Sequence, residues 1–168
     1  MIHENLPVHP YHGPWSQGDE ARLRIDGLVQ RAIELRAADL VALPRTERAE
    51  PFACEEGWTV PDVRWRGMLL SAVIELAGSL PSARYVRVHS GEFVVPVSLS
   101  DAPSAMICDE MNGEPLTREH GAPWRLFVPG DACFTSVKWV ERLEVTAEPG
   151  ERAGERIARA RLRTDAST

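Results

Sequence analysis

Cys54 is the first candidate for chemistry in this 168-residue chain, because it ends a short apolar run and opens a charged turn. A thiolate at the end of a strand can act as a nucleophile or bind a metal ion. Glu55 and Glu56 follow directly, and adjacent negative charge disfavours a thiolate. A cation in front of the sulfur would reverse this effect, and a bound metal would do so fully. The residues alone leave two interpretations open: a reactive or metal-binding thiolate, or a buried cysteine that only fills the core.

The C-terminal half of the chain contains two further groups of polar side chains. His120 and Arg125 flank a Gly-Ala-Pro sequence that suits a tight turn leading into a strand. Ser136 and Lys138 lie two positions apart and would point to the same side of an extended strand. An imidazole, a guanidinium, a hydroxyl and an ammonium close together would bind a phosphate or a polar heterocycle. Each group alone is equally compatible with solvated side chains at the ends of strands.

Together, these groups resemble the molybdopterin-binding domain of the sulfite oxidase family. Residues 52–58 and 65–70 are similar to the cysteine motif of that family, in which a tryptophan follows the cysteine and a W-x-G sequence then leads into a helix. Residues 112–116, 120–130 and 136–140 are similar to the second half of the same domain. The combination of motifs, rather than any one of them, is specific.

The resemblance implies a role for individual residues. Cys54 would be the protein thiolate on molybdenum, a soft metal centre that favours sulfur ligands. A pterin with a phosphate needs hydrogen-bond donors and cations along its length, and Lys138, the only lysine in the chain, would be one of them. The cofactor-binding residues implied in this way are Asn5, Ser90, His120, Arg125, Ser136, Val137 through its backbone, and Lys138.

The same resemblance implies an oxidoreductase that uses molybdopterin and molybdenum to transfer an oxygen atom to or from a small substrate. Its partners would be this oxo-acceptor or oxo-donor and a separate electron-transfer protein, because the sequence has no C-x-x-C-H haem motif. The alternative is a non-catalytic module that binds molybdopterin or serves as an interaction domain without turnover. The enzyme is favoured by the presence of Cys54, His120, Arg125 and Lys138.

The residues after the cysteine depart from the sulfite oxidase pattern. Sulfite oxidases proper carry a basic, Asn-containing segment there, and its charges bind the sulfite anion. Here Glu55 and Glu56 follow instead, which is closer to the methionine-sulfoxide reductase branch with its C-x-E-x-W sequence. That branch has Asn at the position of His120, so the sequence combines features of both. We expect sulfite to be a poor substrate, with a sulfoxide or an N-oxide as other candidates.

Composition and charge argue against several other classes of protein. The net charge of −6 and the pI of about 5.4 disfavour nucleic acid or an anionic membrane as a partner, because both attract basic surfaces. No apolar run approaches the ~18 residues of a membrane-spanning helix, so we expect no membrane insertion. Three cysteines without a C-x-x-C pair argue against a zinc knuckle and a disulfide framework. The first residues are neither basic nor apolar, and we therefore expect a cytoplasmic protein.

The elements that must position these residues follow from the hydropathy pattern. Apolar residues at helical spacing predict a helix over 69–77, which Gly78 ends, and a shorter helix over 37–43. Alternating residues predict strands at 23–26, 33–35, 85–89, 93–99, 124–128, 137–140 and 142–145. Strands and helices mix without a regular βαβ order, which predicts an α+β fold with a largely non-parallel sheet. The resemblance to the sulfite oxidase family implies the fold of its molybdopterin-binding domain, α+β with a mixed sheet and short helices. Residues 1–147 would form the molybdopterin-binding domain, and residues 148–168 a polar, arginine-rich and partly helical C-terminal tail.

Overall fold

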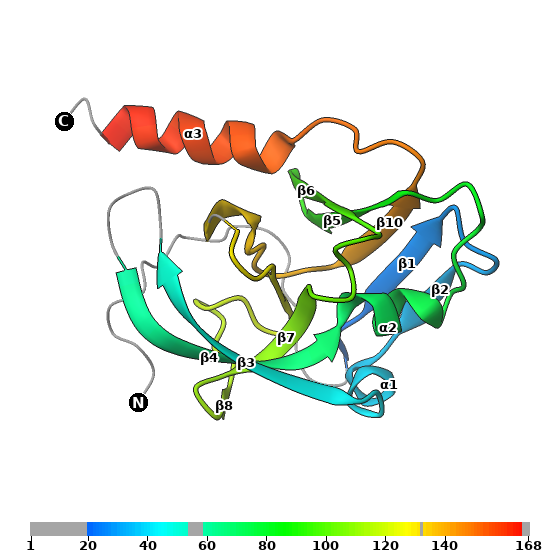
Figure 1. The fold of residues 1–168 in the computed structure, drawn as a ribbon, viewed down its shortest axis with the longest axis horizontal. Helices are drawn as coiled ribbons and strands as arrows, with labels where there is room; N and C mark the ends of the chain where they lie inside the picture. Colours follow the sequence, from blue (N-terminus) through cyan, green and yellow to red (C-terminus); the bar gives the residue numbers. More distant parts are fainter. Residues whose placement is uncertain (1–19, 54–58, 132, 166–168) are drawn as a thin grey trace.

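The computed structural model describes residues 20–53, 59–131 and 133–165, which form two β-sheets with helices around them (Figure 1). The strand order of the first sheet is β2 (Ile33–Leu35), β1 (Leu23–Gly27), β10 (Arg142–Thr146), β5 (Tyr85–Ser90) and β6 (Phe93–Ser98). The strand order of the second sheet is β3 (Arg45–Ala53), β4 (Thr59–Leu69), β7 (Met106–Met111) and β8 (Glu114–Pro115), with β9 (Arg125–Phe127) also paired to β7. The helices are α1 (Ala37–Val41), α2 (Leu70–Glu75) and α3 (Ala153–Asp165), with the 3-10 turn η2 (Cys133–Thr135).

Strand β10, late in the chain, pairs in the first sheet with β1, which lies early in the chain. It lies between β1, to which it is parallel, and β5, to which it is antiparallel. Val86 and Val88 of β5 and Leu143 and Val145 of β10 are buried, because alternate residues of each strand face the core. The residues between them point to the opposite face of the sheet.

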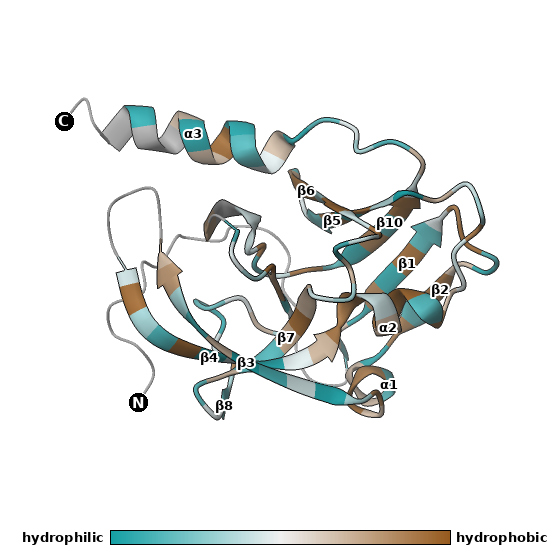
Figure 2. Ribbon diagram, viewed as in Figure 1, coloured by the Kyte–Doolittle hydropathy of each residue, from teal (hydrophilic) through white to brown (hydrophobic). Residues whose placement is uncertain are grey.

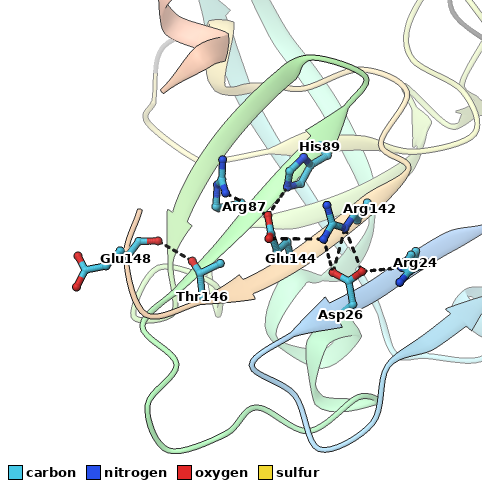
Figure 3. Close-up of polar contacts among 8 residues, drawn as sticks. All are labelled: Arg24, Asp26, Arg87, His89, Arg142, Glu144, Thr146 and Glu148. Carbon is cyan, nitrogen blue, oxygen red and sulfur yellow. Dashed lines mark hydrogen bonds and ion pairs between the residues drawn. The ribbon is translucent and has the colours of Figure 1, made fainter. Parts of the chain in front are cut away.

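That opposite face carries a row of ion pairs across three strands (Figure 3). Asp26 of β1 accepts a hydrogen bond from Nε of Arg142 on β10, at 3.0 Å. On the same strand, Oε2 of Glu144 lies 3.2 Å from Nη1 of Arg87 and 2.9 Å from Nε2 of His89, both on β5. These pairs connect the parallel strand β1 to the antiparallel part of the sheet.

The second sheet is built on a long, curved hairpin of β3 and β4 (Figure 1). The register of β4 against β7 shifts between Arg66 and Gly67. At this shift the two backbones approach so closely that a Cβ on Gly67 would lie 2.1 Å from the carbonyl oxygen of Ile107. Glycine is therefore required for β4 and β7 to pair at this point.

Two clusters of buried apolar side chains form the core. The larger cluster lies between the first sheet and α2 and includes Val73 and Leu143. The smaller cluster belongs to the second sheet and surrounds Trp65, whose ring stacks on Phe127 with 5.5 Å between centroids and meets the edge of Phe52 at 5.6 Å. Figure 2 shows apolar and polar residues alternating along β1 and β4, as expected for strands with one buried face.

The predicted α+β fold class, a mixed sheet with short helices, is confirmed. Asn112 and Gly113 form the turn between β7 and β8, and both residues have positive φ, 54° and 82°. The predicted helix over 69–77 is shorter, because the chain remains extended in β4 up to Leu69.

The predicted strand over 137–140 is wrong. Trp139 has a φ of 56°, which interrupts any extended run. Its backbone N–H donates to the carbonyl oxygen of Gly121 at 3.2 Å, and its indole N–H donates to that of Arg118 at 2.7 Å. This segment is therefore fixed by the loop before β9 instead of by a sheet.

The arginine-rich segment near the C-terminus forms α3, which lies over β6 (Figure 1). Gly154 in its first turn packs closely on that strand, since a Cβ there would lie 2.7 Å from the ring of Phe93 and 3.0 Å from the carbonyl oxygen of Val94. Among the described residues, no helix combines the length and the apolar character needed to cross a membrane.

Candidate functional site

Arg125 lies at the centre of the candidate site, inside the protein. Strand β9 pairs with β7, which places Arg125 opposite Cys108, and only 4% of Arg125 is exposed. Its guanidinium donates from Nε to Oγ of Ser136 at 2.9 Å and from Nη1 to the carbonyl oxygen of His120 at 3.2 Å. The structure thus brings His120, Arg125 and Ser136 together.

Two aromatic rings pack against the Arg125 guanidinium. Its Cζ lies 5.2 Å from the centroid of Phe52 and 4.9 Å from that of Trp65, which is a cation–π geometry. Burial lowers the pKa of Arg125 to about 10, and the neighbouring Cys108 opposes this only in part. In the described part of the chain, no carboxylate contacts Arg125. The site therefore holds a desolvated cation whose charge an anionic ligand would stabilise.

The segment after η2 positions Ser136 and Val137. The Ser136 N–H donates to the carbonyl oxygen of Cys133 at 3.0 Å, which closes the turn. Oγ of Ser136 donates to the carbonyl oxygen of Leu126 at 2.8 Å, and the Leu126 N–H donates to that of Val137, also at 2.8 Å. These bonds hold the irregular segment alongside β9 and keep the Ser136 hydroxyl on the guanidinium.

Lys138 is half-buried and reaches back to the loop before β9. Its Nζ donates to the carbonyl oxygen of Glu119 at 2.8 Å. Burial and then the charge of Arg125 lower the pKa of Lys138 to about 7, although Glu119 acts in the opposite direction. Gly121, with a φ of +105°, makes this approach possible, because a Cβ there would lie 3.0 Å from Cβ of Lys138. The two cations of the site thus repel each other in a poorly solvated place.

The remaining predicted site residues fall into two groups. Ser90 is buried at the end of β5, but none of the described hydrogen bonds joins it to Arg125 or Lys138. Cys54 and Asn5 lie outside the described residues, and so do the two glutamates that follow Cys54. Their roles, like the cofactor contacts of the other residues, remain predictions.

The other two cysteines differ from each other. Cys108 is a free thiol, and burial raises its pKa. Cys133, at the start of η2, is half-buried and disulfide-bonded. The odd number of cysteines and their spacing did not predict this bridge.

Sequence reasoning missed the aromatic walls of the site. Phe52 and Trp65 belong to the cysteine motif, and the sequence shows them only as apolar strand or pre-helix residues. Their contact with Arg125 spans 60 to 73 positions of sequence, so no local pattern reveals it. The usable signal was Trp65 itself, because it belongs to the W-x-G sequence that follows the cysteine in the family motif.

A family model for the oxidoreductase molybdopterin-binding domain matches residues 12–153. The chain belongs to this family. The resemblance to the molybdopterin domain is therefore confirmed, and so is molybdopterin with its molybdenum as the cofactor of the family.

Curated relatives of this molybdopterin-binding domain include the uncharacterised oxidoreductase YuiH of Bacillus subtilis, 35% identical over 75% of this chain and 65% of its own length. The sulfite oxidase of Arabidopsis thaliana is 30% identical over 83% of this chain and 46% of its length. The chain thus spans less than two thirds of either relative. The crystal structure of the sulfane dehydrogenase SoxCD from Paracoccus pantotrophus shares the fold, with a TM-score of 0.77 and 24% identity over 86% of this chain and 43% of that one.

The donor set of the site fits such a cofactor. Molybdopterin carries a phosphate, and Arg125 is a buried cation that no described carboxylate neutralises. Lys138 adds a second cation, and Ser136 and the backbone next to it add neutral polar groups. Charge-assisted hydrogen bonds of this kind are the strong ones in phosphate recognition.

Proposed function

We propose that the chain is an oxidoreductase that binds the molybdenum cofactor and transfers an oxygen atom to or from a small substrate. The observation that carries the proposal is the buried Arg125 guanidinium, which has Lys138 as a neighbouring cation and no described carboxylate as a partner. A buried charge costs stability unless it is paired. An anionic cofactor would supply the missing charge.

The cluster around β9 would hold the pterin and its phosphate. Arg125 and Lys138 would donate charged hydrogen bonds, Ser136 its hydroxyl, Val137 its backbone and His120 its ring. Ser90 and Asn5 would add further polar contacts, and Cys54 would bind the metal through its thiolate. When bound, the cofactor would supply the two-electron redox centre that the side chains themselves lack.

The aromatic cluster would keep water away from the charged part of the site. Phe52 and Trp65 both pack against the guanidinium, and Phe127 stacks on Trp65. A hydrogen bond between charged groups is stronger where water is excluded. The chain would thus hold the cofactor in one orientation with a small number of polar and charged side chains.

The substrate would be a small molecule that gives or accepts oxygen, and a separate protein would exchange electrons. The names of curated relatives, sulfite oxidase and nitrate reductase, agree with small oxygen-containing substrates. Glu55 and Glu56 favour a neutral substrate such as a sulfoxide over the sulfite anion.

The test is Cys54→Ser in protein produced in a strain that synthesises the cofactor. We expect the variant to lose turnover with artificial electron donors and acceptors, while pterin fluorescence shows that the pterin is still bound. Cys108→Ala is the matched control and should keep both metal and turnover, because its buried thiol lies in the core. Full activity in Cys54→Ser would contradict the assignment. A wild-type protein with a full load of cofactor but no turnover with any donor or acceptor would support a non-catalytic module instead.

A further inference from the structure

Helix α3 carries a row of arginines that the proposed function does not use. The members of this arginine row are exposed and lie four, three and four positions apart: Arg152, Arg156, Arg159 and Arg163. Because an α-helix has 3.6 residues per turn, this spacing places them on one side of the helix. The carbonyl oxygen of Arg152 accepts the N–H of Arg156 at 3.1 Å, so Arg152 belongs to the first turn. The opposite side of α3, which contains Gly154, packs on β6 (Figure 1).

The arginine row is a basic surface on an acidic protein. Residues 152–165 contain five arginines and two acidic residues. Glu155 lies 3.8 Å from Arg152 and 2.8 Å from Arg159, yet the side chains of these two arginines remain 71% and 58% exposed. Their charges therefore face solvent. Since the net charge of the whole chain is −6, the rest of the chain is more acidic still.

The beginning of the arginine row adjoins the segment that leads into the candidate site. Arg152 and Thr135 of η2 line the same cavity, which has a volume of about 340 Å³, and α3 also packs against η2. The residue after Thr135 is Ser136, which accepts a hydrogen bond from the Arg125 guanidinium at 2.9 Å. A protein bound along α3 would therefore lie next to the segment that contacts the buried cation of the site.

Among large anionic partners, a protein that carries carboxylates fits the arginine row best. Guanidinium groups bind carboxylates through paired hydrogen bonds. Nucleic acid needs a broad basic surface, whereas this row is one side of one helix on a chain of net charge −6. A helix that lies in a membrane surface inserts an apolar side, and the side of α3 that contains Gly154 is taken up by β6. A compact acidic protein requires only the row itself.

We propose that the arginine row is the docking surface for an acidic electron-transfer protein, one that carries carboxylates around its redox group. The inference rests on the proposed function, which requires a separate protein to exchange electrons. In the oxidative direction, substrate and water give the oxygenated product, two protons and two electrons, and two molecules of a one-electron carrier take up the electrons. In the reductive direction the same carrier supplies them. The carrier must dock twice in each turnover, and small, charged interfaces suit such short encounters.

The first test measures binding of an acidic b5-type cytochrome, which has carboxylates around its haem edge, to the cofactor-loaded protein. Arg156→Gln/Arg159→Gln removes two charges from the row and keeps residues that favour a helix. We expect the Kd to rise at least about 10-fold, because guanidinium–carboxylate pairs are lost. Binding to the wild-type protein should weaken as salt is added. Arg156→Lys/Arg159→Lys keeps the charges and should retain most of the affinity.

Arg24→Gln/Arg31→Gln is the matched control, because it removes the same charge from two other exposed positions. Arg24, like Arg159, pairs with one carboxylate, that of Asp26 at 2.6 Å, and its side chain is 62% exposed. Strand β1, which carries Arg24, is separated from β6 by two strands. The control should bind the cytochrome nearly as well as the wild-type protein. Equal losses in the two glutamine variants, an equal loss in the lysine variant, or tighter binding of duplex DNA or phosphatidylserine vesicles than of the cytochrome would overturn the proposal.

The second test compares turnover with the cytochrome and with a small phenazine dye, which has no protein surface to dock. We expect Arg156→Gln/Arg159→Gln to lower kcat/KM for the cytochrome at least about 10-fold, because encounter depends on the row, and to leave turnover with the dye unchanged. An unchanged kcat/KM for the cytochrome would overturn the docking surface and leave the proposed function intact. A wild-type protein that turns over with neither carrier would contradict the proposed function, whereas a loss of binding confined to the arginine row would still support a docking surface for an acidic protein.

Discussion

At the scale of single residues, Arg125 and Lys138 are the cations that we propose to bind the cofactor. Among the described residues, Arg125 contacts a hydroxyl, a carbonyl oxygen and two aromatic rings. Lys138 donates to a backbone carbonyl, lies over the ring of Trp139 and is within the field of Arg125. A buried arginine that stabilised the fold alone would be expected to pair with a carboxylate, as Arg142 does with Asp26. The surroundings of Arg125 support the proposal that it binds an anion.

Lys138→Met should separate binding from folding, since methionine keeps most of the apolar stem and removes the charge. Charge-assisted hydrogen bonds contribute roughly 1.5–3 kcal/mol, so we expect cofactor retention to fall about 10- to 100-fold. The apo variant should be as stable as the wild-type apo protein or more so, because a poorly solvated charge has been removed. Metal analysis after purification and denaturant unfolding measure the two effects.

Arg31→Met, at an exposed arginine, is the control for the change in net charge. A variant that keeps its cofactor but unfolds at much lower denaturant would identify Lys138 as a structural residue.

Lys138 also predicts a pH dependence of the apo protein. Its pKa is about 7 in the folded protein and lies below its ordinary value of 10.5. Between these values the unfolded chain binds more protons than the folded one, so the free energy of unfolding should rise with pH through this window. Below about pH 7 both states are protonated, and the cost of the charge is fully present. Denaturant unfolding at pH 7 and pH 9.5 measures the rise, which Lys138→Met should reduce. Parallel pH profiles for the two proteins would show that Lys138 is well solvated.

At the scale of elements, the close pairing of β4 and β7 fixes the position of Trp65 in the candidate site. Gly67 lies next to Met68 and two positions after Trp65, and an added Cβ would meet the carbonyl oxygen of Ile107 at 2.1 Å. A backbone atom cannot rotate away as a side chain can. The position of Trp65 under Arg125 therefore depends on a glycine at residue 67.

Gly67→Ala should lower the free energy of unfolding by about 3 kcal/mol or more, at the upper end of the usual cost of overpacking. Gly91→Ala is the matched control, because nothing lies within 4 Å of its added Cβ and only its φ of +55° opposes the change. We expect the control to cost about 1 kcal/mol. Chemical denaturation of both apo variants tests this difference. A smaller loss in Gly67→Ala than in Gly91→Ala would mean that β4 and β7 can separate at low cost.

The sequence predicted the elements with a regular local period and missed those that depend on distant contacts. The alternation of residues 85–89 and 93–99 predicted two strands, and β5 and β6 form there and pair with each other. Strand β4 was missed: Pro61 and Asp62 break the alternation in its first part, and Asp62 has a φ of 56°. Lys138 was placed on a strand, yet its neighbour Trp139 has a left-handed backbone. The cluster of His120, Arg125 and Ser136 was predicted from motifs. The aromatic contacts of this cluster, with Phe52 of β3 and Trp65 of β4, were not predicted.

At the scale of the whole molecule, the chain is acidic, with a net charge of −6, although two poorly solvated cations lie where the cofactor would bind. The arginine-rich α3 lies against β6, and the division at residue 147 between a domain and a tail remains a prediction. An acidic protein repels small anions at long range. A substrate that arrives as an anion must overcome this field before it reaches the site.

Sulfite should therefore be a poor substrate whose turnover improves with salt. We expect a kcat/KM below the ~10⁴ M⁻¹s⁻¹ at the low end of ordinary enzymes, and we expect it to rise with ionic strength because salt screens repulsion. A neutral sulfoxide should show little dependence on salt.

The double variant Glu55→Gln/Glu56→Gln should raise kcat/KM for sulfite and leave that for the sulfoxide unchanged. Glu148→Gln/Glu151→Gln removes the same charge from exposed positions after β10 and is the control for net charge. If the control raises sulfite turnover as much as the first variant, the long-range field of the molecule is the cause. If wild-type kcat/KM for sulfite lies at 10⁴ M⁻¹s⁻¹ or above and falls as salt is added, the two glutamates do not repel the substrate, and an anion is the natural substrate of this domain.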